Sequence, residues 1–137
     1  MPVILKCHVG IGPRVEGYAL VTGDNFSARY DLDRIRGVFS RPEHDLAGQS
    51  YVDKILVVNT AKGGVASAWM LYEMVSRNMA PRALLLNSAN TIVAQGGALA
   101  SMAMCDRFED GDVTELIKNG DQLIVDPEQG QVTILNR

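Results

Sequence analysis

Residues 54–87 read KILVVNTAKGGVASAWMLYEMVSRNMAPRALLLN, and this stretch decides the fold. Its first part, residues 54–59, is a continuous apolar run after one lysine, as is typical of a strand buried on both faces. Residues 65–77 place apolar side chains at helical spacing, which predicts an α-helix. Residues 83–87 form a second apolar run, so the stretch predicts a strand, a helix and a second strand in that order.

Two residues predict where this helix ends. Asn78 and Pro81 follow the helical pattern, and both residue types commonly lie just beyond a helix. A strand that returns to the same sheet through a helix crosses over in the right-handed sense. The two apolar strands are therefore expected to be parallel neighbours in one sheet.

Strand patterns also flank this unit. Residues 3–9 and 15–22 are predicted to be two strands joined by a Gly- and Pro-rich turn, which favours an antiparallel pair. Residues 122–125 and 131–135 surround a Pro-Glu-Gln-Gly turn and predict a terminal hairpin. Residues 113–118 predict one or two helical turns.

The remaining segments carry weaker patterns. Residues 26–49 are irregular apart from a short strand expected near Val38, and so long an irregular stretch is either functional or a solvated loop. Residues 91–104 predict a short strand at 92–93 followed by closely packed backbone. We therefore expect one domain over residues 1–137, of mixed α/β class and rich in strands.

Composition excludes several classes of function. The net charge of −3 gives no basic surface for a phosphate backbone, so nucleic acid is not an expected partner. No apolar run approaches the roughly 20 residues of a membrane span, and no basic leader precedes the first strand, which predicts a cytoplasmic protein with no membrane partner. Cys7 and Cys105 are expected to be free thiols, and the two histidines are not spaced as metal ligands.

The segment between the first strand and the helix is the candidate site. Lys62, Gly63 and Gly64 precede a helix that has no Ser, Thr, Asp or Asn at the usual capping position. First-turn N–H groups such as that of Val65 are then available to a carboxylate or phosphate, although an ordinary hydrated glycine turn is the alternative. Ser67 is the only hydroxyl in this turn, and it either accepts a proton near Lys62 or bonds to the helix backbone.

An ordered series of motifs resembles the aconitase X swivel-domain family. The family run GKILVxP, followed by Thr or Gly, a basic residue, Gly and Ser, corresponds here to DKILVVNTAKGG. A helix ending in Asn-x-x-Pro-x-Ala corresponds to VASAWMLYEMVSRNMAPRALLL, and IVAxGA corresponds to NTIVAQGGALASMAM. VEGYALVT and GDQLIVDPEQGQVTI also fit, so the resemblance extends over about residues 15–135.

The resemblance implies both a fold and a function. The implied fold is the swivelling β/β/α domain of the aconitase superfamily, with a strand-rich, barrel-like core. Family members are small subunits, or fused domains, of hydro-lyases whose large subunit carries an iron or iron–sulfur centre. The chain is thus expected to be a dehydratase small subunit that binds no cofactor itself. It would close over a large subunit and help to dehydrate a small hydroxy acid such as phosphomevalonate or cis-3-hydroxyproline.

The candidate loop differs from the family pattern at its serines. The family serine after the basic-Gly pair, which is thought to be the catalytic base, corresponds to Gly64, and a later one corresponds to Ala68. Ser67 lies between them and is the candidate base. A second family segment, Ser-Phe-x-Gly-Gly, appears here only as FSARYD. The candidate set is Ser67 for catalysis and Lys62, Gly63, Gly64, Val65, Ser27 and Arg29 for substrate binding.

Two other functions stay open from the sequence. A non-catalytic anion-binding or regulatory module would keep the glycine loop and lose the base, and Gly64 is its main support. An ordinary α/β domain without a ligand is the third hypothesis. A neighbouring gene for an aconitase-X-type large chain would favour the enzyme.

Overall fold

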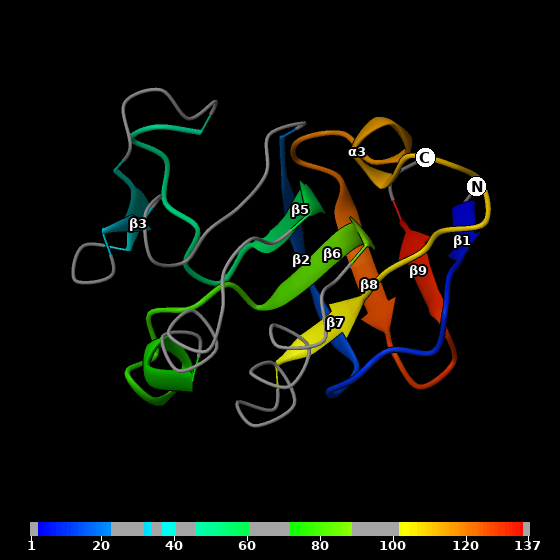
Figure 1. The fold of residues 1–137 in the computed structure, drawn as a ribbon, viewed down its shortest axis with the longest axis horizontal. Helices are drawn as coiled ribbons and strands as arrows, with labels where there is room; N and C mark the ends of the chain where they lie inside the picture. The colour runs from blue at the N-terminus through cyan, green and yellow to red at the C-terminus, as the bar shows by residue number, and fades with distance from the viewer. Residues whose placement is uncertain are drawn as a thin grey trace.

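The structure is a computed structural model that describes residues 3–22, 32–33, 37–40, 46–60, 72–88 and 102–135. Within these ranges the strands form a seven-stranded mixed sheet in the order β1-β9-β8-β2-β5-β6-β7, with a two-stranded sheet, β3-β4, beside it (Figure 1). The elements are β1 Val3–Lys6, β2 Val15–Val21, β3 Leu32–Asp33, β4 Val38–Phe39, β5 Ile55–Thr60, β6 Ala83–Ser88, β7 Ala103–Cys105, α3 Val113–Leu116, β8 Gln122–Asp126 and β9 Gln131–Ile134.

The central pair β5 and β6 is parallel, as the sequence predicted. Ile55 lies opposite Ala83, and the register continues through Val58 opposite Leu86. Residues 72–76 between the strands are helical, which confirms the described part of the expected helix. The rest of that expected helix falls outside the described residues.

The helix between β5 and β6 ends where the sequence predicted. Asn78 has a φ of 57°, the left-handed conformation that commonly follows a helix. The N–H of Met79 donates to the carbonyl of Met74 at 2.9 Å, and the N–H of Asn78 donates to that of Val75 at 3.1 Å. These two bonds form a Schellman motif, which satisfies carbonyls that the helix itself leaves unpaired.

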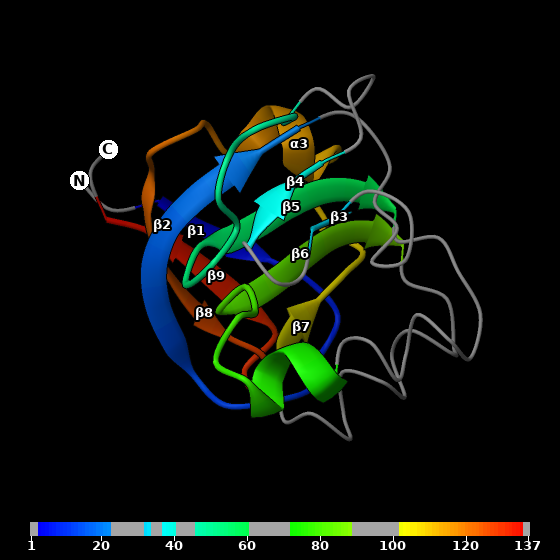
Figure 2. The same ribbon diagram turned by 90° about the vertical axis from the view of Figure 1, so that its left-hand side faces the viewer.

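Both faces of β5 and β6 are covered, because their side chains alternate between two hydrophobic clusters. Ile55 and Val57 belong to a cluster with α3 and the antiparallel strands, whereas Leu56 and Val58 belong to one on the opposite face. The second cluster includes residues of the segment before β5 and of the helix end, namely Phe39, Leu46, Tyr51 and Met74. The described strands thus wrap around one core and carry a second layer outside it (Figure 2).

The sheet closes on itself because the chain after β1 reaches β7, the opposite edge strand. Ile11 and Met104 exchange two backbone hydrogen bonds, of 3.0 and 2.9 Å. Gly10 permits this approach, since a Cβ there would lie 2.0 Å from the carbonyl oxygen of Met104. We call this line of contact, residues 7–11 against residues 104–106, the seam.

The predicted antiparallel pairing of residues 3–9 with 15–22 is wrong. β1 pairs with β9, and β2 pairs with β8 on one side and with β5 on the other. The Gly- and Pro-rich residues between β1 and β2 do not form a tight hairpin turn, because they cross to β7 and close the seam.

The other described elements match the expected ones, except for two strands that the sequence did not predict, β3 and β7. β4, α3 and the β8–β9 hairpin lie where the sequence predicted them. β7 was not predicted as a strand, although the sequence indicated closely packed backbone there. The strand expected at residues 92–93 lies outside the described residues. Among the described helices, none is both long and apolar enough to cross a membrane.

The helix end provides a test of the fold with two matched substitutions. Asn78→Ala should lower the free energy of unfolding by about 1 kcal/mol, because alanine is strained in the left-handed region. Asn78→Gly should leave it unchanged or raise it, because glycine adopts this backbone without strain. Denaturant titration of the two variants measures the difference, and equal stabilities would contradict the assigned backbone.

Candidate functional site

The sequence-predicted site residues lie outside the described residues. Lys62, Gly63, Gly64, Val65 and Ser67 belong to residues 61–71, and Ser27 and Arg29 belong to residues 23–31. Their arrangement therefore stays a prediction. The structure does describe β2 and β5, the parallel strands that precede these two segments in the sequence.

Three parallel strands end at one edge of the sheet. β2 is parallel to β5, and β5 is parallel to β6, so their carboxyl ends lie together (Figure 1). Thr22 extends the β2–β5 ladder by one bond, since its N–H donates to the carbonyl of Val57 at 3.0 Å. We call the ends of these strands, at Thr22, Thr60 and Ser88, the carboxyl edge. Ligand sites commonly lie beyond the carboxyl ends of parallel strands, in open sheets and in barrels alike, and residues 23–31 and 61–71 follow directly after two of these ends in the sequence.

Asn87 is the centre of the described hydrogen bonds at the carboxyl edge. Its Nδ2 donates to Oδ1 of Asn59 at 3.0 Å and to Oδ1 of Asp112 at 2.8 Å. Its Oδ1 accepts from the N–H of Val113 at 2.8 Å, and its carbonyl accepts from the N–H of Arg107 at 3.1 Å. One amide side chain thereby ties β6 to β5 and to the start of α3.

Asp112 caps α3 beside Asn87. Its Oδ1 accepts from the N–H of Thr114 at 2.9 Å and from the Thr114 hydroxyl at 2.7 Å. The hydrogen bond from Asn87 and those from Thr114 hold the pKa of Asp112 below its ordinary value, because they stabilise the carboxylate. Asp112 is therefore an ionised structural acceptor and not a proton donor at neutral pH.

The described part of the carboxyl edge is suited to positioning and not to bond chemistry. Its side chains are amides, hydroxyls and the engaged Asp112 carboxylate, and both atoms of the Asn87 amide have protein partners. Among the residues that the structure describes, no three His, Cys, Asp or Glu side chains are grouped as a metal site would require.

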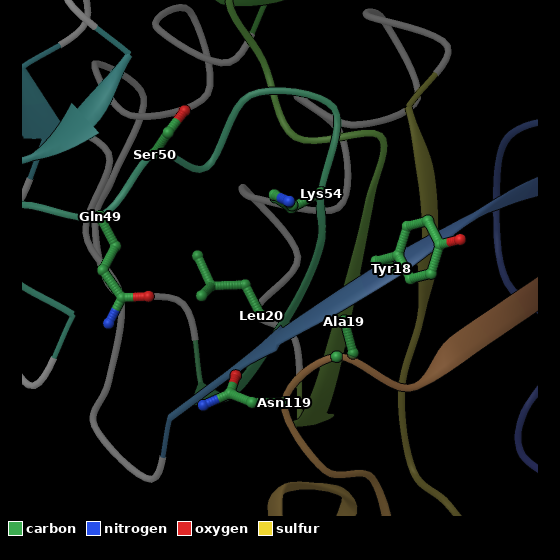
Figure 3. Close-up of a pocket in the computed structure, with 8 residues that line it drawn as sticks. Tyr18, Ala19, Leu20, Gln49, Ser50, Lys54 and Asn119 are labelled. Atoms are coloured by element: carbon green, nitrogen blue, oxygen red, sulfur yellow. The ribbon is translucent and has the colours of Figure 1, made fainter. Parts of the chain in front are cut away.

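A separate cleft of about 630 Å³ opens beside β2 (Figure 3). Leu20, Lys54 and Asn119 line it together with Tyr18, whose hydroxyl points away from Lys54 in this view. Lys54 directly precedes β5 and so lies at the opposite end of that strand from Thr60. The cleft is thus not the carboxyl edge, and sequence analysis assigned it no role.

Sequence analysis also missed Asn59, Asn87 and Asp112. A signal existed for Asp112, because an Asp followed three residues later by Glu115 is a common start of a helix. No comparable signal existed for the asparagines, since their pairing depends on the register of β5 against β6.

The family model described as the aconitase X swivel domain matches residues 4–134. The phosphomevalonate dehydratase small subunit of Thermococcus sibiricus is 32% identical over 130 residues, which are 95% of this chain and 97% of that protein. The small subunit of the same name from Thermococcus kodakarensis is 34% identical and covers 96% of each chain.

A solved structure is also similar to this chain. The crystal structure of Thermococcus kodakaraensis aconitase X in its holo-form superposes with a TM-score of 0.90 at 30% sequence identity. The match covers 98% of this chain and 99% of that chain, so the two chains share the same fold.

The Asn87 network provides a stability test. Asn87→Ala removes three side-chain hydrogen bonds and should lower the free energy of unfolding by about 2 kcal/mol or more, since these bonds link β6 to β5 and to the start of α3. Ser88→Ala, at the next and exposed position, should change it by less than about 0.5 kcal/mol. Denaturant titration compares them, and equal effects would contradict the central role of Asn87.

The same variant has a pH signature. In Asn87→Ala the pKa of Asp112 should rise toward its ordinary value, because the largest cause of its lowering is gone. In the native chain the stability from ionised Asp112 is present above the unfolded pKa and is lost as pH falls through the lower folded pKa. Carboxyl NMR titration of the two proteins measures the shift.

Proposed function

The chain belongs to the aconitase X swivel-domain family, and from this premise we propose that it is the small subunit of a dehydratase that works with a large subunit. It is a hydro-lyase subunit that closes over the partner's substrate pocket. The observation that carries this proposal is the agreement in length with the relatives named as small subunits, which reaches 95% of this chain and 97% of the relative.

The described framework suits a lid that moves as one body. Its closed sheet is filled by a continuous core in which Ile55, Val57 and Leu85 are 0% exposed. A body of this kind can rotate without changing shape, because packed interiors resist deformation. Closure of such a lid excludes water from a reacting substrate and completes the site around it.

An iron or iron–sulfur centre belongs, in this proposal, to the large subunit. The described residues do not fit such a group, because they hold no cluster of three metal-binding side chains, and their two cysteines are free thiols that hydrogen-bond to each other. We therefore assign this chain the binding, orientation and shielding of the substrate, together with at most one proton acceptor.

Substrate binding is assigned to the segments that continue from the carboxyl edge. Lys62 supplies a positive charge, and the N–H groups of Gly63, Gly64 and Val65 supply donors for a carboxylate or phosphate. Ser27 and Arg29, after β2, are further candidates for the same anion. Anchoring an anionic group at a distance from the reacting carbon would orient the substrate for water loss.

Proton transfer is assigned to Ser67 or to the partner. A serine accepts a proton poorly unless a neighbouring positive charge favours its alkoxide, and Lys62 is the nearest cation in the sequence. Gly64 cannot take this role, since it has no side chain.

The first substrate to be tested is phosphomevalonate, because the two small subunits compared above carry that name. It also has the chemistry that the glycine segment would recognise, namely a phosphate and a carboxylate on a small hydroxy acid. A second candidate function, a non-catalytic anion-binding module, rests on Gly64 at the family's serine position.

Activity should depend on the complex. The purified chain alone should not dehydrate phosphomevalonate, whereas the chain combined with its large subunit should turn it over, measured by loss of substrate and gain of the unsaturated product. Turnover by the chain alone would contradict the proposal. An intact complex that binds phosphomevalonate but never dehydrates it, or any other hydroxy acid of a panel, would establish the non-catalytic module.

A matched pair of serine variants tests the proton acceptor. Ser67→Ala in the complex should lower kcat by about 100-fold or more if Ser67 is the base. Ser76→Ala is the control, since its hydroxyl donates to the carbonyl of Glu73 within the exposed helix. Native turnover in both variants would show that the base belongs to the large subunit. This chain would then act only as a lid that binds the anionic group of the substrate.

A further inference from the structure

The two cysteines of the chain meet across the seam. Cys7 follows β1, and Cys105 is the last residue of β7, so they come from the two edge strands of the seven-stranded sheet. Their thiols hydrogen-bond to each other. Cys105 is 1% exposed, whereas Cys7 is half-buried and packs against the cluster that contains Cys105.

Backbone contacts hold the two cysteines in place. The N–H of Cys7 donates to the carbonyl of Gly130 at 2.9 Å, and that of His8 donates to the carbonyl of Asp106 at 3.2 Å. Ile11 and Met104 fix the seam a few residues further along. The backbones on the two sides of the seam are therefore already brought together, as a disulfide between the two thiols requires.

The surroundings shift the pKa values of the two thiols in opposite directions. The hydrogen bond from Cys105 lowers the pKa of the Cys7 thiol, although burial and the carboxylates of Asp106 and Glu109 act against this. The same hydrogen bond and burial raise the pKa of Cys105. Cys7 is thus the more acidic and more accessible thiol, as the first nucleophile of an exchange reaction must be.

We propose that Cys7 and Cys105 form a reversible disulfide that covalently closes the seam, by exchange with a small-molecule disulfide such as oxidised glutathione. The Cys7 thiolate attacks one sulfur of the oxidant, forms a mixed disulfide and releases one thiolate. The Cys105 thiol loses its proton and attacks the Cys7 sulfur, which forms the Cys7–Cys105 bond and releases the second thiolate. Two protein thiols are oxidised, and one disulfide is reduced to two thiols.

This closure would act next to the carboxyl edge. β7 is parallel to β6, so Cys105 ends at the same side of the sheet as Ser88. Two residues later the N–H of Arg107 donates to the carbonyl of Asn87. The inference concerns the chain itself and does not depend on the proposed dehydratase function.

The test is equilibration of the full chain in glutathione buffers of rising oxidised fraction. The thiol count of the native chain should fall from two to zero in one reversible step, and a non-reducing digest should contain the Cys7–Cys105 peptide pair. The oxidised chain should melt higher by on the order of 10 °C, because the bond closes a long loop. Reduced glutathione should restore both thiols and the lower melting temperature.

Matched variants decide the assignment. Cys7→Ser should keep its fold and show no rise in melting temperature under oxidised glutathione, and Cys105→Ala, which suits the buried site better than serine, should behave in the same way. Two thiols that persist in fully oxidised buffer would overturn the proposal. A stable mixed disulfide on Cys7 alone, or a bond between two chains, would overturn it as well.

Discussion

Burial of β5 and β6 on both faces is the constraint on which the rest of the structure depends. Leu56, Val57, Leu84 and Leu85 are all 0% exposed, and side chains that alternate along a strand cannot all be buried by one layer. One cluster therefore fills the closed sheet, and the other lies under the segment before β5 and the helix end. Strands that are buried on both faces commonly pair in parallel, as β5 and β6 do. Parallel pairing places the carboxyl ends of these strands side by side, and this forms the carboxyl edge.

The parts of the fold that could be predicted are those with local causes. The apolar runs of β5 and β6, the helix stop at Asn78 and the turn of the β8–β9 hairpin each depend on a few neighbouring residues. The partners of β1 and β2 could not be predicted in this way, because strand pairing at long range leaves no local pattern. The local sequence places Gly10 in a turn, yet its lack of a side chain permits the contact with Met104 in a distant strand.

The candidate site also has one part that could be predicted from the sequence and one part that could not. The glycine segment with Lys62 and Ser67 could be proposed from the sequence, because unsatisfied helix N–H groups and a cation have a recognisable pattern. The Asn87 network could not, because an asparagine acquires a role only when its register and the adjacent helix start are known. What the structure adds to the sequence is therefore the support for the site and not its reacting groups.

This division fits the proposed role of the chain as the small subunit of a dehydratase. A swivelling lid must present its binding segments in a fixed arrangement each time it closes, which requires their attachment points to be rigid. Asn87 fixes β6 against β5 and α3, and the seam holds β7 beside them. Because Arg107 lies between Cys105 and α3 and bonds to Asn87, the seam and the carboxyl edge form one continuous structure. A constraint placed at the seam would then reach the Asn87 network through two residues of backbone.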